Sequence, residues 1–161
     1  MPNWIERIVA SSLGLAAILA VVTVEAQAAS LAENLQGKWS GSGEIALASG
    51  ESARIRCRGF GRAVSESTIE QQFFCASTDK EFNFFTSIRV SEGRARGEWK
   101  APDRSGTLSG DASASSLKLH LSSASGEGDL SATIEACSQS LRVTGWSNEL
   151  KSMSVSLEKE C

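Results

Sequence analysis

Four cysteines are the residues best suited to chemistry in this chain: Cys57, Cys75, Cys137 and Cys161. Thiols pair into disulfides in oxidising compartments, and in reducing ones they more often bind zinc. Cysteine-based zinc sites usually contain a C-x-x-C spacing, which the sequence lacks, and the single histidine, His120, is near neither pair of cysteines. We therefore expect two disulfides, no metal site and no free thiol.

Four cysteines allow three pairings, and the sequence alone leaves all three open. Proximity along the chain favours Cys57–Cys75, on consecutive predicted strands, and Cys137–Cys161. Each pair would close a loop of about 20 residues and stabilise the fold by about 3 kcal/mol in the chain-entropy description.

The other reactive side chains do not form a catalytic group. His120 lies between Lys118 and Ser122 on the polar side of a predicted strand, where a solvated histidine is the ordinary interpretation. Neither a G-x-S-x-G motif nor a phosphate-binding glycine loop is present. We expect a non-enzymatic protein without a cofactor.

Residues 1–28 predict a signal peptide. Arg7 precedes an uncharged run from Ile8 to Val24, and Ala26-Gln27-Ala28 has the small-x-small pattern that a signal peptidase cuts. A membrane anchor is the alternative, but the run is short for a span and no basic cluster follows it. Cleavage after Ala28 would leave one domain, residues 29–161, in the periplasm or outside the cell, without a stable membrane anchor.

Charge and composition narrow the choice of partners. The formal net charge of −3 gives no electrostatic reason to bind nucleic acid. Tyrosine is absent, and serine and glycine are frequent, which suits short strands and turns better than helices. The oligomeric state stays open.

From Lys38 onward, apolar and polar residues alternate with period two, and turn residues interrupt the alternation every 8–12 residues. This pattern predicts an all-β, antiparallel up-and-down meander of about ten strands, with room for one short helix at Leu31–Leu35. A sheet with one apolar face must bury that face, so we expect closure into a barrel or half-barrel. A two-layer β-sandwich is the alternative.

Gly37-Lys38-Trp39 resembles the G-x-W signature of the lipocalins and related calycin barrels. In that family the tryptophan closes the narrow end of the barrel and a basic residue of the last strand packs across its ring. The resemblance implies that Lys159 does so here.

Two further resemblances concern small exported proteins. The segment from Gly37 to Gly43, together with Arg56-Cys57-Arg58 and Gly97-Glu-Trp99, is similar to segments of uncharacterised exported proteins of alphaproteobacteria. This resemblance implies no activity. The segment from Ser30 to Trp39 resembles the start of exported bacterial metalloprotease inhibitors, small β-barrels with a flexible N-terminal tail and an early G-x-W. That likeness implies a protein-binding role for the tail.

The inward face mixes large apolar residues with glycine and alanine, which predicts space inside the closed sheet for a small, largely apolar ligand. The candidate lining residues are Trp39, Ile45, Ile55, Phe73, Phe84, Ile88, Trp99, Leu119 and Ile134.

The outward face contains the candidate surface for another envelope protein. Arg54, Arg56 and Arg58 form a cationic row with period two, beside which Glu66 and Glu70 could lie on the next strand. Phe74 and Phe85 break the alternation on adjacent strands and are expected to meet as an outward cross-strand pair. For the arginine row we favour a solvated strand face with cross-strand ion pairs over a binding role.

Overall fold

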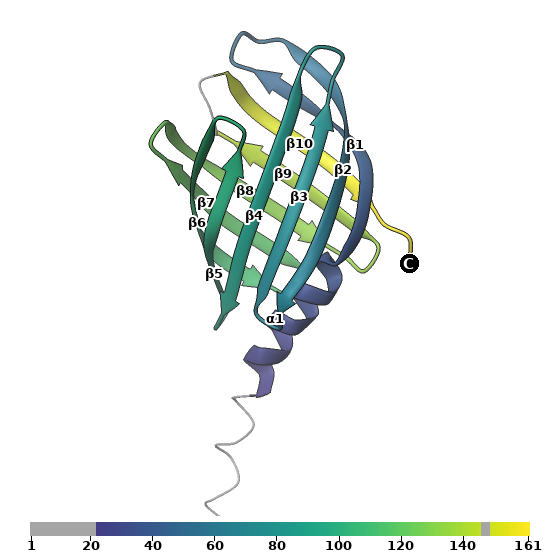
Figure 1. Ribbon diagram of the computed structural model, residues 1–161, viewed down its shortest axis with the longest axis vertical. Coiled ribbons are helices and arrows are strands. Elements are labelled where there is room, and N and C mark those ends of the chain that lie inside the picture. The colour runs from purple at the N-terminus through teal and green to yellow at the C-terminus, as the bar shows by residue number, and fades with distance from the viewer. Residues whose placement is uncertain (1–21, 146–148) are drawn as a thin grey trace, which may run out of the picture.

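The computed structural model describes residues 22–145 and 149–161, which form one helix and ten strands (Figure 1). In chain order these are α1 (Val22–Leu35), β1 (Gly37–Leu47), β2 (Ser52–Ser65), β3 (Thr68–Ala76), β4 (Glu81–Ser91), β5 (Arg94–Ala101), β6 (Arg104–Ser113), β7 (Ser116–Ser123), β8 (Gly126–Ile134), β9 (Ser138–Thr144) and β10 (Leu150–Glu158).

The sheet closes on itself because β1 pairs with both β2 and β10. Each of the strands from β2 to β9 pairs with the strand before it and the strand after it, always antiparallel. Short turns join neighbouring strands, which is the connectivity of an up-and-down barrel. The predicted barrel is confirmed, and the two-layer sandwich is wrong.

The core lies inside the barrel because successive side chains of a strand point to opposite faces. In β3, Ile69, Phe73 and Cys75 are buried, whereas Gln72 and Phe74 are exposed. The same alternation recurs around the barrel, so the apolar face of the meander is the inner wall.

Helix α1 lies at one end of the barrel, where β1 begins and β10 ends (Figure 1). Leu31 and Leu35 are fully buried, and Asn34 Nδ2 donates a hydrogen bond of 3.2 Å to the carbonyl oxygen of Ala114 in the turn between β6 and β7. The helix therefore plugs this end, which we call the closed end. The opposite rim, where β4 and β10 begin, is called the mouth.

The helix is longer than the sequence predicts, since α1 spans Val22–Leu35 and the expected helix covers only Leu31–Leu35. The alanine-rich stretch before Leu31 has high helix propensity, and Gly37, with a φ of 111°, lies just beyond the end of the helix. Cleavage after Ala28 stays a prediction, and its site falls inside α1. Residues 1–21 of the predicted signal peptide lie outside the described residues. Within the described part of the chain, no helix has the length and apolar character needed to cross a membrane.

Gly41 shows why the seam between β1 and β10 needs a small residue. A β carbon at this position would lie 1.9 Å from the carbonyl oxygen of Ser156 on β10, closer than any real contact. A side chain here would push the two strands apart, so glycine permits the closure of the barrel.

Candidate functional site

The closed end is sealed by Trp39, Lys159 and the last turn of α1. Trp39 is almost fully buried, and its Nε1 donates a hydrogen bond of 3.0 Å to the carbonyl oxygen of Leu35. Lys159 Nζ lies 4.8 Å from the centre of the Trp39 ring, in a cation–π contact. This is the packing that the lipocalin resemblance implies for these two residues.

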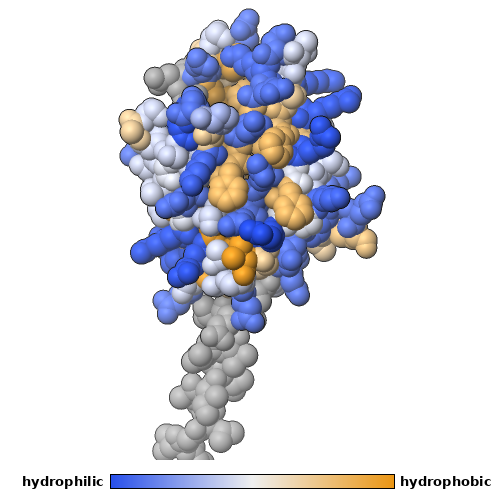
Figure 2. Space-filling view, in the orientation of Figure 1, coloured by the Kyte–Doolittle hydropathy of each residue, from blue (hydrophilic) through white to orange (hydrophobic). Residues whose placement is uncertain are grey.

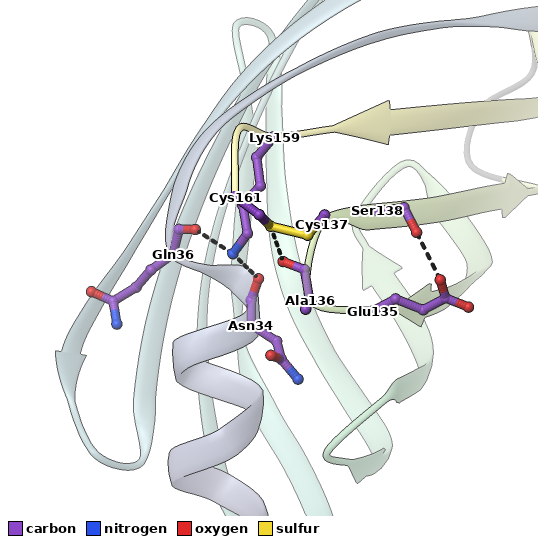
Figure 3. The surroundings of a disulfide bond; sticks show 8 residues. All are labelled: Asn34, Gln36, Glu135, Ala136, Cys137, Ser138, Lys159 and Cys161. Carbon is purple, nitrogen blue, oxygen red and sulfur yellow. Dashed lines mark hydrogen bonds between the residues drawn. A yellow bond between two sulfur atoms is a disulfide. The ribbon is translucent and has the colours of Figure 1, made fainter.

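Lys159 also fastens the end of the helix (Figure 3). Its Nζ donates hydrogen bonds of 2.7 Å to the carbonyl oxygen of Asn34 and 2.9 Å to that of Gln36. A cation at a helix C-terminus satisfies carbonyl groups that lack partners within the helix. Burial lowers the pKa of Lys159, because it disfavours the charged form of the amine. Trp39, Lys159 and the end of α1 thus close this end of the barrel.

The two disulfides have the pairing that proximity along the chain favours. Cys57 and Cys75 face each other across β2 and β3, and their bond lies inside the barrel. The bond between Cys137 and Cys161 is at the surface near the closed end, beside Lys159 (Figure 3). Two disulfides and no free cysteine indicate an oxidising, non-cytoplasmic environment.

A cavity of about 40 Å³ lies in the barrel interior. Strands β2, β3 and β4 form one wall, and β7, β8, β9 and β10 form the wall that faces it. Apart from Gln71 and Thr86, the lining side chains are apolar or belong to the Cys57–Cys75 disulfide. The cavity is thus suited to hydrocarbon, but its volume is well below the roughly 300–1,000 Å³ of ordinary small-molecule sites.

Gln71 and Thr86 are the polar residues of this cavity. They face each other in the register of β3 and β4, and both are almost fully buried. The Gln71 Nε2 atom has no hydrogen-bond partner among the described residues. An amide donor without a partner in an apolar interior is unfavourable, so this atom is available to a ligand acceptor.

A second pocket, of about 360 Å³, lies across the mouth. Leu47 and Leu150 contribute to it from the β1 and β10 side, and Phe82 contributes from β4. Phe82 also lines the inner cavity, so this residue borders both spaces. The ammonium of Lys80 lies 4.0 Å from the Glu149 carboxylate, which connects the β3–β4 turn to the residue before β10.

All nine predicted lining residues are buried inside the barrel, but they play different parts. Phe73, Phe84 and Ile88 line the cavity. The others pack in the core without lining it: Trp39, Ile45, Ile55, Trp99, Leu119 and Ile134. For example, Trp99 packs on Phe84 with 5.9 Å between ring centres and fills space beside the cavity.

Three residues of the site escaped prediction: Gln71, Thr86 and Phe82. The first two carry a signal in the sequence, because each is a polar residue at an inward position of an otherwise apolar alternation. The role of Phe82 depends on where the mouth lies, and the alternation does not reveal that.

The predicted arginine row lies along the outer face of β2. Arg54, Arg56 and Arg58 are exposed, and within residues 22–145 and 149–161 none of the three forms an ion pair. Glu66 lies in the turn after β2, and Glu70 pairs instead with Arg62, whose Nη2 is 2.6 Å from its Oε2. The cross-strand ion pairs expected for the arginine row are therefore absent among the described residues.

An apolar patch accompanies the arginine row on β2, β3 and β4. Phe74 is 48 % exposed, Phe60 50 % and Val64 52 %, whereas Phe85 is half-buried. Figure 2 shows orange side chains over these strands, surrounded by blue ones. Phe60 and Val64 were not predicted. They follow the segment of β2 in which Arg54, Arg56 and Arg58 alternate with inward-facing residues.

The expected direct pair of Phe74 with Phe85 is wrong. Phe74 lies opposite Asn83, and Phe85 lies opposite Gln72, so the two rings are diagonal neighbours. The turn between β3 and β4 sets this register, and a strand pattern alone does not fix it.

His120 lies on the outer face of β7, as the sequence predicts. Its Nδ1 is 3.1 Å from Asp129 Oδ1 on β8, and its Nε2 is 3.7 Å from Glu127 Oε2. The imidazole is about half exposed, and it belongs to neither the inner cavity nor the mouth pocket.

The fold defines the class: the described chain is a closed, ten-stranded, up-and-down antiparallel β-barrel with a helix at one end. Rv2717c from M. tuberculosis is similar, with a TM-score of 0.65 and 15% identity, over 83% of this chain and 98% of that chain. The S-type phycobiliprotein lyase CPES from Guillardia theta has a TM-score of 0.61 and 8% identity, over 84% of this chain and 93% of that chain.

A third similar structure is EF1p2_mFAP2b bound to DFHBI, with a TM-score of 0.52 and 9% identity, over 82% of this chain and 98% of that chain. Identities this low show a shared fold and nothing finer. No protein-family model matches the sequence, and no curated protein matches it.

Proposed function

We propose that this protein is an exported, non-enzymatic barrel that binds a small, largely apolar ligand in its interior, in the periplasm or outside the cell. The observation that carries the proposal is the apolar inner cavity, which meets the mouth pocket at Phe82. The Cys57–Cys75 and Cys137–Cys161 disulfides and the signal-peptide pattern of residues 1–28 support export.

The sizes of the two spaces suggest how a ligand sits. The mouth pocket, at about 360 Å³, lies within the range of small-molecule sites, whereas the inner cavity of about 40 Å³ has room for only a few atoms. A ligand would occupy the mouth and extend one end into the cavity as the Phe82 ring turns aside. Leu47 and Leu150 would contact the part that remains in the mouth.

Two comparisons support a barrel of this kind as a ligand holder. EF1p2_mFAP2b has a similar fold and is bound to DFHBI. At the closed end, the Trp39–Lys159 contact matches the arrangement that the lipocalin resemblance implies. Both the fold and the sealed end are thus suited to binding through the mouth.

Binding can be tested with N-phenyl-1-naphthylamine, an uncharged probe whose fluorescence rises in apolar surroundings. We expect saturable uptake by the wild-type protein. Val143→Phe places a ring in the cavity wall and is expected to weaken binding at least tenfold, because the ring takes the space that the ligand needs. Val64→Phe makes the same substitution on the outer face and should leave binding unchanged.

Val155→Ile also fills part of the cavity, but it adds only one methylene group. It provides a second test in case Val143→Phe does not fold. Circular dichroism shows whether each variant is folded. The absence of saturable uptake by the wild type, or equal affinity in the wild type and both filled variants, would refute the proposal.

A second candidate function is binding of another envelope protein through the outer face of β2 and β3. Arg54, Arg56 and Arg58 are exposed cations without ion pairs among the described residues, and Phe74 lies beside them in the register, opposite Arg58. Unpaired cations next to an exposed ring suit a partner that presents acidic and apolar side chains together. Residues 30–35 pack in α1 at the closed end, so the structure does not place them in a free inhibitory tail.

The second candidate predicts salt-sensitive capture of a defined partner from periplasmic extract. Arg56→Glu combined with Phe74→Ser should reduce the affinity for the captured protein at least tenfold. The double variant loses both the attraction of Arg56 to acidic residues of the partner and the apolar contact of the Phe74 ring. Arg142→Glu, on the outer face of β9, is the matched control and should have little effect. If the captured partner binds the double variant and the wild type with equal affinity, this surface is not its binding site.

A further inference from the structure

The geometry of the inner cavity points to the chemical class of its ligand. We propose that the cavity takes an uncharged molecule with a carbonyl oxygen at its buried end, and that Gln71 Nε2 donates a hydrogen bond to that oxygen. This inference rests on the proposed function and narrows it to one kind of ligand.

Gln71 lines the cavity from the inner face of β3. It lies between Gly61 on β2 and Thr86 on β4, and all three positions face inward. On the side of Gly61, the space that a β carbon would occupy is taken by the carbonyl oxygen of Leu35, at 1.9 Å from that point. The end of α1 thus fills the space beside Gly61, the register partner of Gln71 on β2.

The Nε2 donor of Gln71 lacks a hydrogen-bond partner among the described residues. Only 4 % of the residue is exposed, and Nε2 has no hydrogen bond within the described part of the chain. A buried donor in this state is destabilising relative to an apolar residue of the same shape. A leucine here would match the rest of the inner wall, so the glutamine is best explained by an acceptor that arrives from outside.

The acceptor must belong to an uncharged group, because no residue that lines the cavity is charged. A carboxylate buried here would lack a counter-ion, and an isolated buried charge is far more unfavourable than a neutral acceptor. The nearby cation, Lys159, is already engaged with the carbonyl oxygens of Asn34 and Gln36. Ketones, aldehydes and esters meet the requirement, and fatty-acid anions do not.

The rest of the lining sets the orientation of the ligand. Gln71 and Thr86 lie on the closed-end side of the cavity, whereas Phe82, at the start of β4, lies at the mouth. The carbonyl end would therefore enter first, and the hydrocarbon chain would run between the facing walls toward Phe82.

The test uses displacement of N-phenyl-1-naphthylamine by 2-heptanone, heptane and heptanoate. The measured quantity is the ratio of the heptane to the 2-heptanone dissociation constant, in the wild type and in Gln71→Leu. Removal of one well-placed donor is expected to lower this ratio about tenfold. Heptanoate is expected to bind the wild type more weakly than 2-heptanone does.

Gln139→Leu is the matched control for the loss of a buried amide. Gln139 is also almost fully buried, both of its amide atoms lack partners among the described residues, and it does not line the cavity. Its replacement should leave the ratio unchanged. Gln71→Met provides a second apolar variant in case the leucine packs badly.

The outcomes separate this inference from the proposed function. If the probe binds and the ratio is the same in the wild type and in both Gln71 variants, the amide is satisfied by buried water and only this inference fails. Tighter binding of heptanoate than of 2-heptanone also overturns it. If neither the probe nor any of the three compounds binds, the inference and the proposed function fail together.

Discussion

Replacing Trp39 with alanine is expected to lower the free energy of unfolding by about 3–5 kcal/mol, as is usual for truncation of a fully buried tryptophan. The substitution removes the ring that plugs the closed end and the hydrogen bond from Nε1 to the Leu35 carbonyl oxygen. It also removes the aromatic face over which Lys159 lies. The helix and the last strand would thus lose a contact that they share.

Guanidinium denaturation followed by far-UV circular dichroism measures this effect without relying on tryptophan emission. Trp39→Phe keeps a ring but loses the Nε1 donor, so a smaller loss of about 1–2 kcal/mol is expected. Lys38→Ala, on the outer face of the same strand, should change stability by no more than about 0.5 kcal/mol. A loss below about 1 kcal/mol for Trp39→Ala would show that the ring does not seal this end.

Removal of the inner disulfide by Cys57→Ala and Cys75→Ala together is expected to cost about 3 kcal/mol of stability, since the bond closes a loop with a sequence separation of 18. In the chain-entropy description, the loss arises because the unfolded chain has more conformational entropy without the bond. Cys57 and Cys75 both line the inner cavity, so loss of their sulfur atoms is expected to enlarge it. The variant should therefore be less stable and yet accept bulkier apolar probes.

The neighbouring register pair provides the matched control. Arg58 and Phe74 face each other across the same two strands on the outer side, and Arg58→Ala with Phe74→Ala should cost less than about 1 kcal/mol. Urea denaturation of both double variants under non-reducing conditions compares the pairs. If both double variants lose the same free energy of unfolding, the disulfide stabilises the protein no more than an ordinary cross-strand contact does.

The alternation of apolar and polar residues was sufficient to predict the strands and the inner wall. Phe73 and Cys75 could be assigned to the interior because side chains on a strand alternate strictly. Closure could be predicted because an apolar sheet face without helices to cover it must be buried against itself. The disulfide pairing is the one that proximity along the chain favours, although the sequence alone left all three pairings open.

Features that depend on three-dimensional fit could not be predicted in this way. Trp99 and Phe73 both point inward, but only Phe73 borders empty space, because Trp99 packs against Phe84. The register that separates Phe74 from Phe85 is set by a turn and not by the strands. The length of α1 was missed because the alanine-rich run before Leu31 fits both an export signal and a helix.

The seam between β1 and β10 has a consequence for how the protein is made. Each hairpin along the meander joins neighbours in sequence, but the seam brings Ser40 opposite Glu158. Such distant pairing is slow to form, and until it does both edge strands carry unpaired backbone groups that invite aggregation. The sheet therefore stays open until β10 is available to pair with β1, and both edge strands are exposed during that interval.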